Sequence, residues 1–157
     1  MVDDEVTIRP ATLEDVPELV RLRRMMFEAM GCDDTDALDQ ADAGVRPFLE
    51  AALRVGTFHG WLATTSTGEA VGSGGVLIDQ HPPGPANLSG RIGYILNVVT
   101  IPRYRRQGIA RRMMETMLDW LAGQGIEVVA LHASEAGRPL YRQLGFVDSN
   151  EMRMRIE

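Results

Sequence analysis

The sequence predicts an α+β fold in which a mixed, mostly antiparallel sheet is flanked by helices. Two features carry this prediction: β-prone segments alternate with amphipathic helical segments, and a strand-helix-strand unit in the C-terminal half indicates one parallel crossover. The expected order of elements is β-α-α-β-β-β-α-β-α-β. A length of 157 residues suits one core, so we expect a single domain over residues 1–157.

The chain is expected to begin with a strand that leads directly into a helix. Residues 6–9 alternate apolar and polar side chains, and Pro10 ends the alternation, which is typical of a short strand. Thr12 and Asp15 have the spacing of a capping box. Apolar positions then follow at helical spacing, so a first helix is predicted to run to about Met30.

A second helix and a β-hairpin are predicted next. The helix covers residues 37–53, and Gly44 and Pro47 leave open whether it is divided into two. Residues 58–64 and 70–78 are β-prone and are separated by a turn, which predicts a hairpin. The Gly-Ser-Gly-Gly run inside the second of these strands is typical of a bulge or of a close approach between backbones.

The C-terminal half carries the clearest helical pattern of the chain. Residues 91–100 are strongly β-prone, and residues 107–122 place apolar side chains on one helical face. A strand of the buried type is predicted over residues 126–133. A short helix over residues 137–144 and a final strand over residues 146–156 complete the expected sheet.

Composition argues against several classes of protein. The formal net charge of −6 disfavours a general nucleic-acid binder, which needs an excess of basic residues. No apolar run approaches the roughly 18 residues of a membrane span. Cys32 is the only cysteine, so no internal disulfide can form, and the acidic start is unlike a signal peptide. We therefore expect a cytoplasmic protein that binds neither nucleic acid nor membrane.

The join between strand 91–100 and the helix that follows has the pattern of an anion site. The backbone N–H groups of residues 106–110 would be free at the helix start, where the helix dipole adds partial positive charge. Gly108 lets an anion approach the backbone closely. Full charges come from the surrounding arginines Arg103, Arg105, Arg106, Arg111 and Arg112. Taken alone, a basic helix start on a solvated face explains the same residues equally well.

Two motifs at the right separation resemble the GNAT superfamily of GCN5-related N-acetyltransferases. Arg105-x-x-Gly108-x-Ala110 matches the family's pyrophosphate motif, which follows a strand and opens a helix. Residues 133–146, with their Leu-Gly-Phe ending, match the second family signature. The resemblance covers essentially the whole chain. It implies the GNAT fold, with a splayed central pair of strands, and an acyl-CoA-dependent activity.

The resemblance implies acetyl-CoA as the co-substrate. It places the pantetheine arm along the backbone of residues 97–100, as an added strand would lie, and the pyrophosphate on the N–H groups at the helix start. Ser134 stands where many members of the family have an asparagine. The residues expected to bind the coenzyme are Val98, Val99, Thr100, Arg105, Arg106, Gln107, Gly108, Ile109, Ala110, Arg111, Ser134, Gly137 and Leu140.

The resemblance further implies that an amine attacks the thioester directly, with Tyr141 as the general acid that protonates the departing thiolate. A backbone N–H near Val98 or Val99 can polarise the carbonyl. This chemistry needs no metal and no cysteine nucleophile, and Cys32 lies in an acidic loop. An amphipathic core tyrosine beside Phe146 is the alternative interpretation of Tyr141.

The acceptor side of the site is less well defined by the sequence. The candidates for contact with the amine are Met26, Met30, Tyr94, Asn97 and His132. Ordinary core packing is an alternative explanation for each of them. Glu28 and Glu135 could act as general base through water. An acidic loop that could attract a cationic amine follows the first helix at Asp33, Asp34 and Asp36.

The predicted function is transfer of the acetyl group of acetyl-CoA to a primary amine of a small molecule. Three alternatives stay open: another acyl donor, a protein amino group as acceptor, or a non-catalytic acyl-CoA sensor. A homodimer is also expected, because of the resemblance and because the β-prone tail at residues 151–156 offers an edge for pairing.

Overall fold

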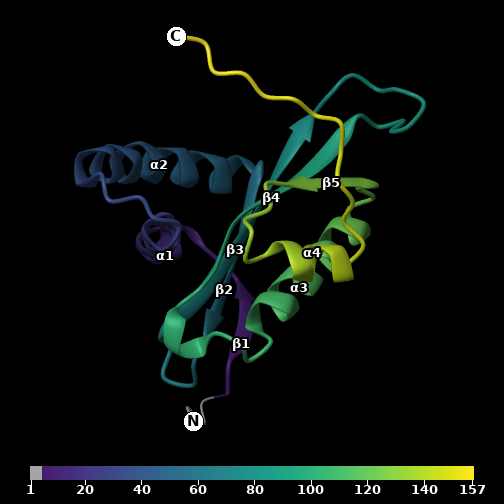
Figure 1. Ribbon diagram of the computed structural model, residues 1–157. Helices are drawn as coiled ribbons and strands as arrows, with labels where there is room; N and C mark the ends of the chain where they lie inside the picture. Colours follow the sequence, from purple (N-terminus) through teal and green to yellow (C-terminus); the bar gives the residue numbers. More distant parts are fainter. Residues whose placement is uncertain (1–4) are drawn as a thin grey trace.

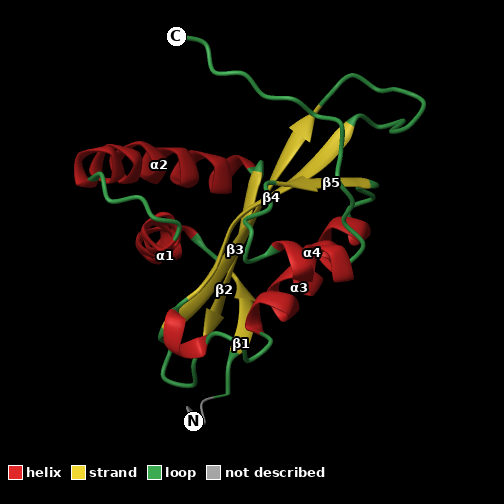
Figure 2. Ribbon diagram, viewed as in Figure 1, coloured by secondary structure: helices red, strands yellow, loops and turns green. Residues whose placement is uncertain are grey.

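Helices cover both faces of one sheet. α1 (Val16–Ala29) and α2 (Thr35–Val55) lie on one face, and α3 (Ile109–Gly123) and α4 (Arg138–Gln143) lie on the other (Figure 1). Figure 2 shows the same three layers by type of structure. The arrangement confirms the predicted α+β class.

A computed structural model describes residues 5–157, so the acidic start at residues 1–4 lies outside the described part. Within that part, no helix is both long enough and apolar enough to cross a membrane. Two short 3-10 segments precede the longer helices, η1 (Leu13–Asp15) before α1 and η2 (Pro102–Tyr104) before α3.

The sheet places its strands side by side in the order in which they occur along the chain. Neighbouring strands are antiparallel except for the last pair, β4 and β5, which is parallel and is joined by α3. Both the hairpin and the single crossover are therefore confirmed. The strands are β1 (Thr7–Pro10), β2 (Phe58–Thr64), β3 (Ala70–Gln80), β4 (Arg91–Thr100) and β5 (Val128–Leu131).

The long helix α2 is continuous, so neither Gly44 nor Pro47 divides it. Pro47 removes one backbone donor, but a buried face that includes Leu38 and Leu49 holds the helix on the sheet. Gly56, in the left-handed conformation with φ +79°, ends it.

Several predicted boundaries differ from the structure by a few residues, and two of these differences lie beside the site. α3 begins at Ile109 rather than at residue 107, because Arg106 and Gly108 have φ values of 63° and 77°, outside the right-handed helical region. β5 covers only residues 128–131, since its ladder with β4 extends no further than four pairs.

The glycine-rich part of β3 provides close approach between elements, as predicted. A Cβ added at Gly74 would lie 2.8 Å from Cγ of Met113 on α3. A Cβ at Gly75 would lie 2.6 Å from the ring of Phe58 on β2. The register of β3 against β4 also shifts between Ser73 and Gly75, so the bulge is present as well. Gly74 therefore lets α3 pack directly on the middle of the sheet, and Gly75 leaves room for the ring of Phe58.

The predicted final strand over residues 146–156 is wrong. These residues form no strand, and the chain leaves the body of the molecule toward the C-terminus (Figures 1 and 2). A strand needs a neighbour to satisfy its backbone N–H and C=O groups. Beyond Phe146 no backbone ladder bond is made to another described residue. The tail therefore has the residue pattern of a strand, but it has no neighbouring strand to pair with.

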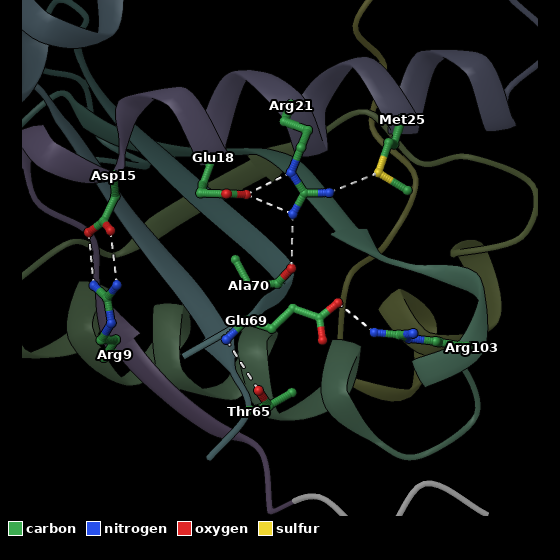
Figure 3. A network of polar contacts seen from close by, with 9 residues as sticks. All are labelled: Arg9, Asp15, Glu18, Arg21, Met25, Thr65, Glu69, Ala70 and Arg103. Carbon is green, nitrogen blue, oxygen red and sulfur yellow. Dashed lines mark hydrogen bonds and ion pairs between the residues drawn. The ribbon is translucent and has the colours of Figure 1, made fainter. Parts of the chain in front are cut away.

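A charged contact and the predicted capping box lie at the start of η1, which leads directly into α1. Nη1 and Nη2 of Arg9 donate to the two carboxylate oxygens of Asp15 at 2.8 and 2.9 Å (Figure 3). The backbone N–H of Thr12 donates to Asp15 at 2.7 Å. Hydrogen bonds from Arg9, together with that N–H, lower the pKa of Asp15 to about 2.

Asp15→Asn is expected to lower the free energy of unfolding by about 1 kcal/mol near neutral pH, since it removes the ion pair with Arg9 and the negative charge that accepts the N–H of Thr12. The carboxylate has a lower pKa in the folded chain than its usual 3.8, so its contribution is present above that value. It is lost as the pH falls through the folded value near 2. Chemical denaturation across this range should show the two proteins converging in acid.

The matched control for this substitution is Asp119→Asn, which alters an exposed carboxylate on α3 that has no hydrogen bond or ion pair with the described residues. It should leave the free energy of unfolding nearly unchanged. Equal effects of the two substitutions would contradict the role assigned to Asp15.

α1 is also tied to the sheet by Arg21. Its Nη2 donates to the carbonyl of Ala70 at the start of β3 at 3.0 Å, while its Nε donates to Glu18 at 2.7 Å (Figure 3). The neighbouring Glu69 pairs with Arg103 in η2 at 2.5 Å. α1, β3 and the segment before α3 are therefore fixed relative to one another.

Candidate functional site

A cavity of about 910 Å³ lies where β4 and β5 part. Its walls come from the C-terminal half of α1, from β4, from the start of α3, and from the segment that runs from the end of β5 through α4. This volume is in the range of sites for small ligands and cofactors. Of the residues predicted to bind the coenzyme, to act as general acid or to contact the amine, all except Gln107 lie in its lining.

The central strands part after four residue pairs. Ile92 to Ile95 of β4 pair with β5, and Ile95 opposite Leu131 is the last pair. Residues 96–100 therefore have no strand partner on that side within the described chain. Their backbone forms an open edge that an extended ligand can pair with in the manner of an added strand. The splayed pair expected from the sequence is present.

A bulge in β4 marks the point of parting. Asn97 has φ +57°, a conformation that is uncommon for residues other than glycine, and neither Asn97 nor Val98 has a Cα partner in β3. The hydroxyl of Ser73, which is buried, donates to the carbonyl of Asn97 at 3.2 Å. This hydrogen bond from the neighbouring strand stabilises the bulge. In the bulge, the backbone of residues 97–98 departs from the regular ladder.

The start of α3 presents a set of free donors. The N–H groups of residues 106–111 make no hydrogen bond with other described residues, and the first bond of the helix runs from Arg112 N–H to Gly108 O at 3.0 Å. A Cβ added at Gly108 would meet nothing within 4 Å. Free N–H groups at a helix start, with open space in front of them, form an anion site.

The arginines around this loop divide into two groups. Arg105 and Arg106 line the cavity, as does Arg111, which is held by Gln143 of α4. Arg103 and Arg112 lie outside the cavity: Arg103 pairs with Glu69, and Arg112 donates to the carbonyl of Val6 at 2.8 Å, so the prediction that these two supply charge to the anion site is wrong. Gln107 also lies outside: its side chain donates to the carbonyl of Arg103 at 3.3 Å, so only its backbone can serve the anion site.

Tyr141 of α4 lines the cavity and is partly buried. Burial raises the pKa of its phenol, so the group stays protonated at neutral pH. Gly137 packs against the ring, where an added Cβ would lie 2.8 Å from Cε2. The ring also meets Phe146 edge to face, with centroids 6.0 Å apart. Both interpretations of Tyr141 thus describe part of its environment, packing on one side and an open cavity on the other.

Ser134 closes the turn that leads into α4. Its Oγ accepts from the N–H of Gly137 at 3.1 Å, and its carbonyl accepts from the N–H of Arg138 at 3.0 Å. The hydroxyl of Ser134 donates to no described residue, and Ser134 lines the cavity. Leu140 lies one turn further on and adds an apolar contact to the same wall.

The candidates for the acceptor side lie together in the lining. They come from α1, from β4 and from the residue after β5, and they are Met26, Met30, Tyr94, Asn97 and His132. The rings of Tyr94 and His132 meet edge to face with centroids 5.5 Å apart. This contact joins β4 to the end of β5 beside the open edge.

The carboxylates considered for the acceptor side do not line the cavity. Asp34 accepts from the N–H of Ala37 at 3.1 Å and caps α2, and its acidic neighbours are exposed. Glu28 lies 3.9 Å from Arg24 and borders a smaller hollow instead. Glu135 is exposed. No Asp or Glu occurs in the described lining of the main cavity.

Sequence reasoning missed one charged residue of the lining, Arg23 of α1. The signal was present, because Arg23 occupies a position on the otherwise apolar face that includes Leu19, Val20 and Phe27. A charge at such a position is uncommon in a helix that packs on a sheet.

Comparison with known families and proteins agrees with this geometry. The model of the Acetyltransferase (GNAT) family matches residues 19–146. A glucosamine 6-phosphate N-acetyltransferase of Trypanosoma brucei brucei is 32% identical over 92 residues, which are 58% of this chain and 59% of that protein. The chain thus matches less than two thirds of the length of this relative.

Two solved structures are similar over nearly their whole length. A GCN5-related N-acetyltransferase from Ralstonia eutropha JMP134 has a TM-score of 0.90 and 31% identity, with 97% of this chain and 99% of that chain covered. A predicted acetyltransferase from Clostridium acetobutylicum, crystallised with acetyl-CoA, has a TM-score of 0.87 and 26% identity, with 97% and 96% covered. The similarity therefore includes the elements that surround the cavity.

Proposed function

The chain belongs to the acetyltransferase (GNAT) family, and on that premise we propose that it transfers the acetyl group of acetyl-CoA to the primary amine of a small molecule. One observation carries the proposal. The open edge of β4, the free N–H groups at the start of α3 and the phenol of Tyr141 all face a single cavity.

The residues present fit acetyl-CoA. The N–H groups of residues 106–111, with Arg105, Arg106 and Arg111, would hold the pyrophosphate. Residues 97–100 would pair with the amide groups of the pantetheine arm. The open space in front of Gly108 matches the need for close approach of a phosphate to the backbone.

The proposed step is direct attack of the amine nitrogen on the acetyl carbonyl carbon. A C–N bond forms, the C–S bond breaks, and the nitrogen gives up a proton to solvent. A backbone N–H at Val98 or Val99 would stabilise the negative charge that develops on the carbonyl oxygen. Tyr141 would donate its phenolic proton to the departing sulfur, which leaves as the thiol of CoA, and the phenolate would then take up a proton from solvent.

Three alternatives to this proposal are a non-catalytic acyl-CoA sensor, a protein amino group as the acceptor, and another acyl donor. Tyr141 in the cavity favours an enzyme over a sensor, because binding alone does not require a proton donor there. A small-molecule acceptor is favoured over a protein amine by the relative that is named for a phosphorylated amino sugar. A longer acyl group is the remaining variant of the same reaction.

Release of free CoA from acetyl-CoA, measured with a panel of primary amines, tests the proposal. We expect turnover with at least one small amine and slower turnover with lysine-containing peptides. Tight binding of acetyl-CoA without release of CoA on any amine would favour the sensor instead. Faster turnover with a longer acyl-CoA would change the donor but not the reaction.

We further propose that the protein forms a homodimer through its C-terminal tail, residues 147–157. Apolar Met152, Met154 and Ile156 alternate with charged residues, so an extended tail has one apolar face. The four large apolar side chains of the tail, those three and Val147, are between 79% and 93% exposed. The outer edge of β5 has no strand partner in the described chain. A tail from a second copy would supply that partner.

Deletion of residues 147–157 is expected to convert a dimer into a monomer, as measured by light scattering coupled to gel filtration. Met154→Glu should weaken the dimer for the same reason, because it puts a charge on the apolar face of the tail. Arg155→Gln, on the other face, is the matched control and should leave the dimer intact. A monomeric full-length chain at micromolar concentration would rule out the proposed dimer.

A further inference from the structure

Arg23 of α1 is a partly buried cation that lacks a partner. It lines the main cavity, its Nη1 is buried without a hydrogen bond, and no ion pair joins it to any described residue. Its guanidinium carbon lies 4.8 Å from the centre of the Phe27 ring, one turn further along the same helix. A stack on an aromatic ring holds the group in place but leaves its charge uncompensated.

The next residue of the same helix, Arg24, has its charge compensated by ion pairs with carboxylates. Its Nη1 lies 2.7 Å from Asp39 and 2.9 Å from Asp42, and its Nε lies 3.9 Å from Glu28. The nearby carboxylates of α2 are therefore engaged by Arg24. Asp42 acts on Arg23 only at longer range, without contact.

An uncompensated buried cation is costly, so such groups are usually paired or serve a ligand. Burial lowers the pKa of Arg23, but an arginine stays charged in proteins near neutral pH. Arg23 belongs to the lining of the cavity, so a ligand held there can reach its side chain. The missing partner can therefore be supplied from the cavity side, as an anion.

The charge of the cavity as a whole has the same sign. Its described lining has no carboxylate, and its charged residues are Arg23 on the side of α1 and Arg105, Arg106 and Arg111 near the start of α3. A polycationic acceptor would find no counter-charge there. An acceptor whose single ammonium group is balanced by an anionic group would find one at Arg23.

We propose that the acceptor carries an anionic group, a phosphate or a carboxylate, in addition to its primary amine, and that Arg23 binds this group. The inference rests on the proposed acetyl transfer, because it names the substrate class of that same site. Planar guanidinium groups bind both anions through two parallel hydrogen bonds. Met26, Phe27 and Met30 on the same helix face would contact the apolar part of the acceptor.

The position of Arg23 separates this role from coenzyme binding. The three arginines proposed for the pyrophosphate lie next to the free N–H groups at the start of α3. Arg23 comes from α1, on the opposite face of the sheet (Figure 1). Its charge is therefore available to the second substrate when the first one is bound.

The test compares pairs of primary amines that differ by one anionic group. The pairs are phosphoethanolamine with ethanolamine, glucosamine 6-phosphate with glucosamine, and γ-aminobutyrate with butylamine. The first two pairs probe a phosphate and the third probes a carboxylate. Each amine is assayed by CoA release with the wild type, with Arg23→Gln and with Arg23→Lys. Arg46→Gln is the matched control, because Arg46 is an exposed arginine of α2 outside the cavity.

The wild type is expected to favour the anionic member of at least one pair. Arg23→Gln should lower kcat/KM for that member by about 10- to 100-fold, mainly through KM, and change its neutral partner by less than about 3-fold. Arg23→Lys should recover part of the loss, since it restores the charge without the planar fork. The KM for acetyl-CoA should be the same in all variants.

Three results would overturn the inference. The wild type could prefer the neutral member of every pair, Arg23→Gln could slow both members of a pair equally, or Arg23→Gln could raise the KM for acetyl-CoA. The last of these would assign Arg23 to the donor.

A binding measurement separates this inference from the proposed function. Calorimetry with phosphoethanolamine, glucosamine 6-phosphate and γ-aminobutyrate, in the presence of saturating CoA, reports on the anion site without any turnover. Binding that depends on Arg23 in a protein that acetylates no amine would refute acetyl transfer and uphold the anion site. If the protein transfers acetyl groups but Arg23→Gln does not change the affinity for these anions, acetyl transfer is upheld and the anion site is refuted.

Discussion

Gly108→Val is expected to weaken acetyl-CoA binding by at least about 100-fold. Gly108 has φ +77°, which a β-branched residue adopts only at a cost, and it faces open space in front of the free N–H groups at the start of α3. A valine would place its methyl groups where the pyrophosphate is proposed to lie. The loss of two charge-assisted hydrogen bonds alone accounts for a change of this size. Equilibrium titration with acetyl-CoA measures it.

The other end of α3 provides a matched control. Gly125 also has a positive φ, +75°, and a Cβ there would likewise meet nothing within 4 Å. Gly125→Val imposes the same backbone strain far from the proposed phosphate site. We expect the two variants to be destabilised alike while only Gly108→Val loses the coenzyme. Unchanged affinity of Gly108→Val would refute the phosphate assignment.

Tyr141→Phe is expected to lower kcat by about 10²- to 10⁴-fold with little change in the affinity for acetyl-CoA. The substitution removes only the phenolic proton, which would otherwise pass to the departing thiolate. The packing of the ring on Gly137 and Phe146 should persist, because neither contact uses the hydroxyl. Steady-state kinetics with the best amine of the panel, together with an acetyl-CoA titration, checks both parts.

Tyr94→Phe is the control for this prediction, because it removes another phenol of the cavity lining, on β4. We expect a much smaller effect on kcat, since Tyr94 is a candidate for orienting the acceptor rather than for proton transfer. Turnover of Tyr141→Phe equal to that of the wild type would show that Tyr141 is not the general acid.

Local sequence signals predicted the free N–H groups at the start of α3, where we propose that the coenzyme binds. The glycine and the arginines between a strand and a helix indicate a helix-start anion site, because every feature of such a site lies within a few consecutive residues. The hairpin, the crossover and the capping box at Thr12 also depend on neighbours in sequence. These features depend mainly on residues that are close together in the sequence, so the sequence alone was enough to predict them.

Features that depend on distant partners could not be predicted in the same way. The alternating tail has the pattern of a strand, but a strand also needs an edge to pair with, and the described chain supplies none. The bulge at Asn97 depends on a hydroxyl from the neighbouring strand, Ser73. The local pattern of apolar residues indicates neither the missing strand partner of the tail nor the hydrogen bond from Ser73.

The acceptor side shows the same limit. The sequence indicated that an acidic loop, Asp33, Asp34 and Asp36, could attract a cationic amine. In the structure Asp34 caps α2, and none of the three residues lines the cavity. Arg23 had no such local cluster around it, and its importance depends on which carboxylates Arg24 engages. That Arg23 is left without a carboxylate partner follows only from the packing of α1 against α2.

The central claim is direct acetyl transfer within a complex of enzyme, acetyl-CoA and amine. The sharpest measurement is mass spectrometry of a single turnover, in which enzyme, acetyl-CoA and the best amine of the panel are mixed and sampled over time. We predict that the N-acetylated amine and free CoA appear together in equal amounts, while the mass of the protein never changes. Acetyl-CoA that stays intact on the protein, or an acetyl group that appears on the protein before the amine, would contradict the account.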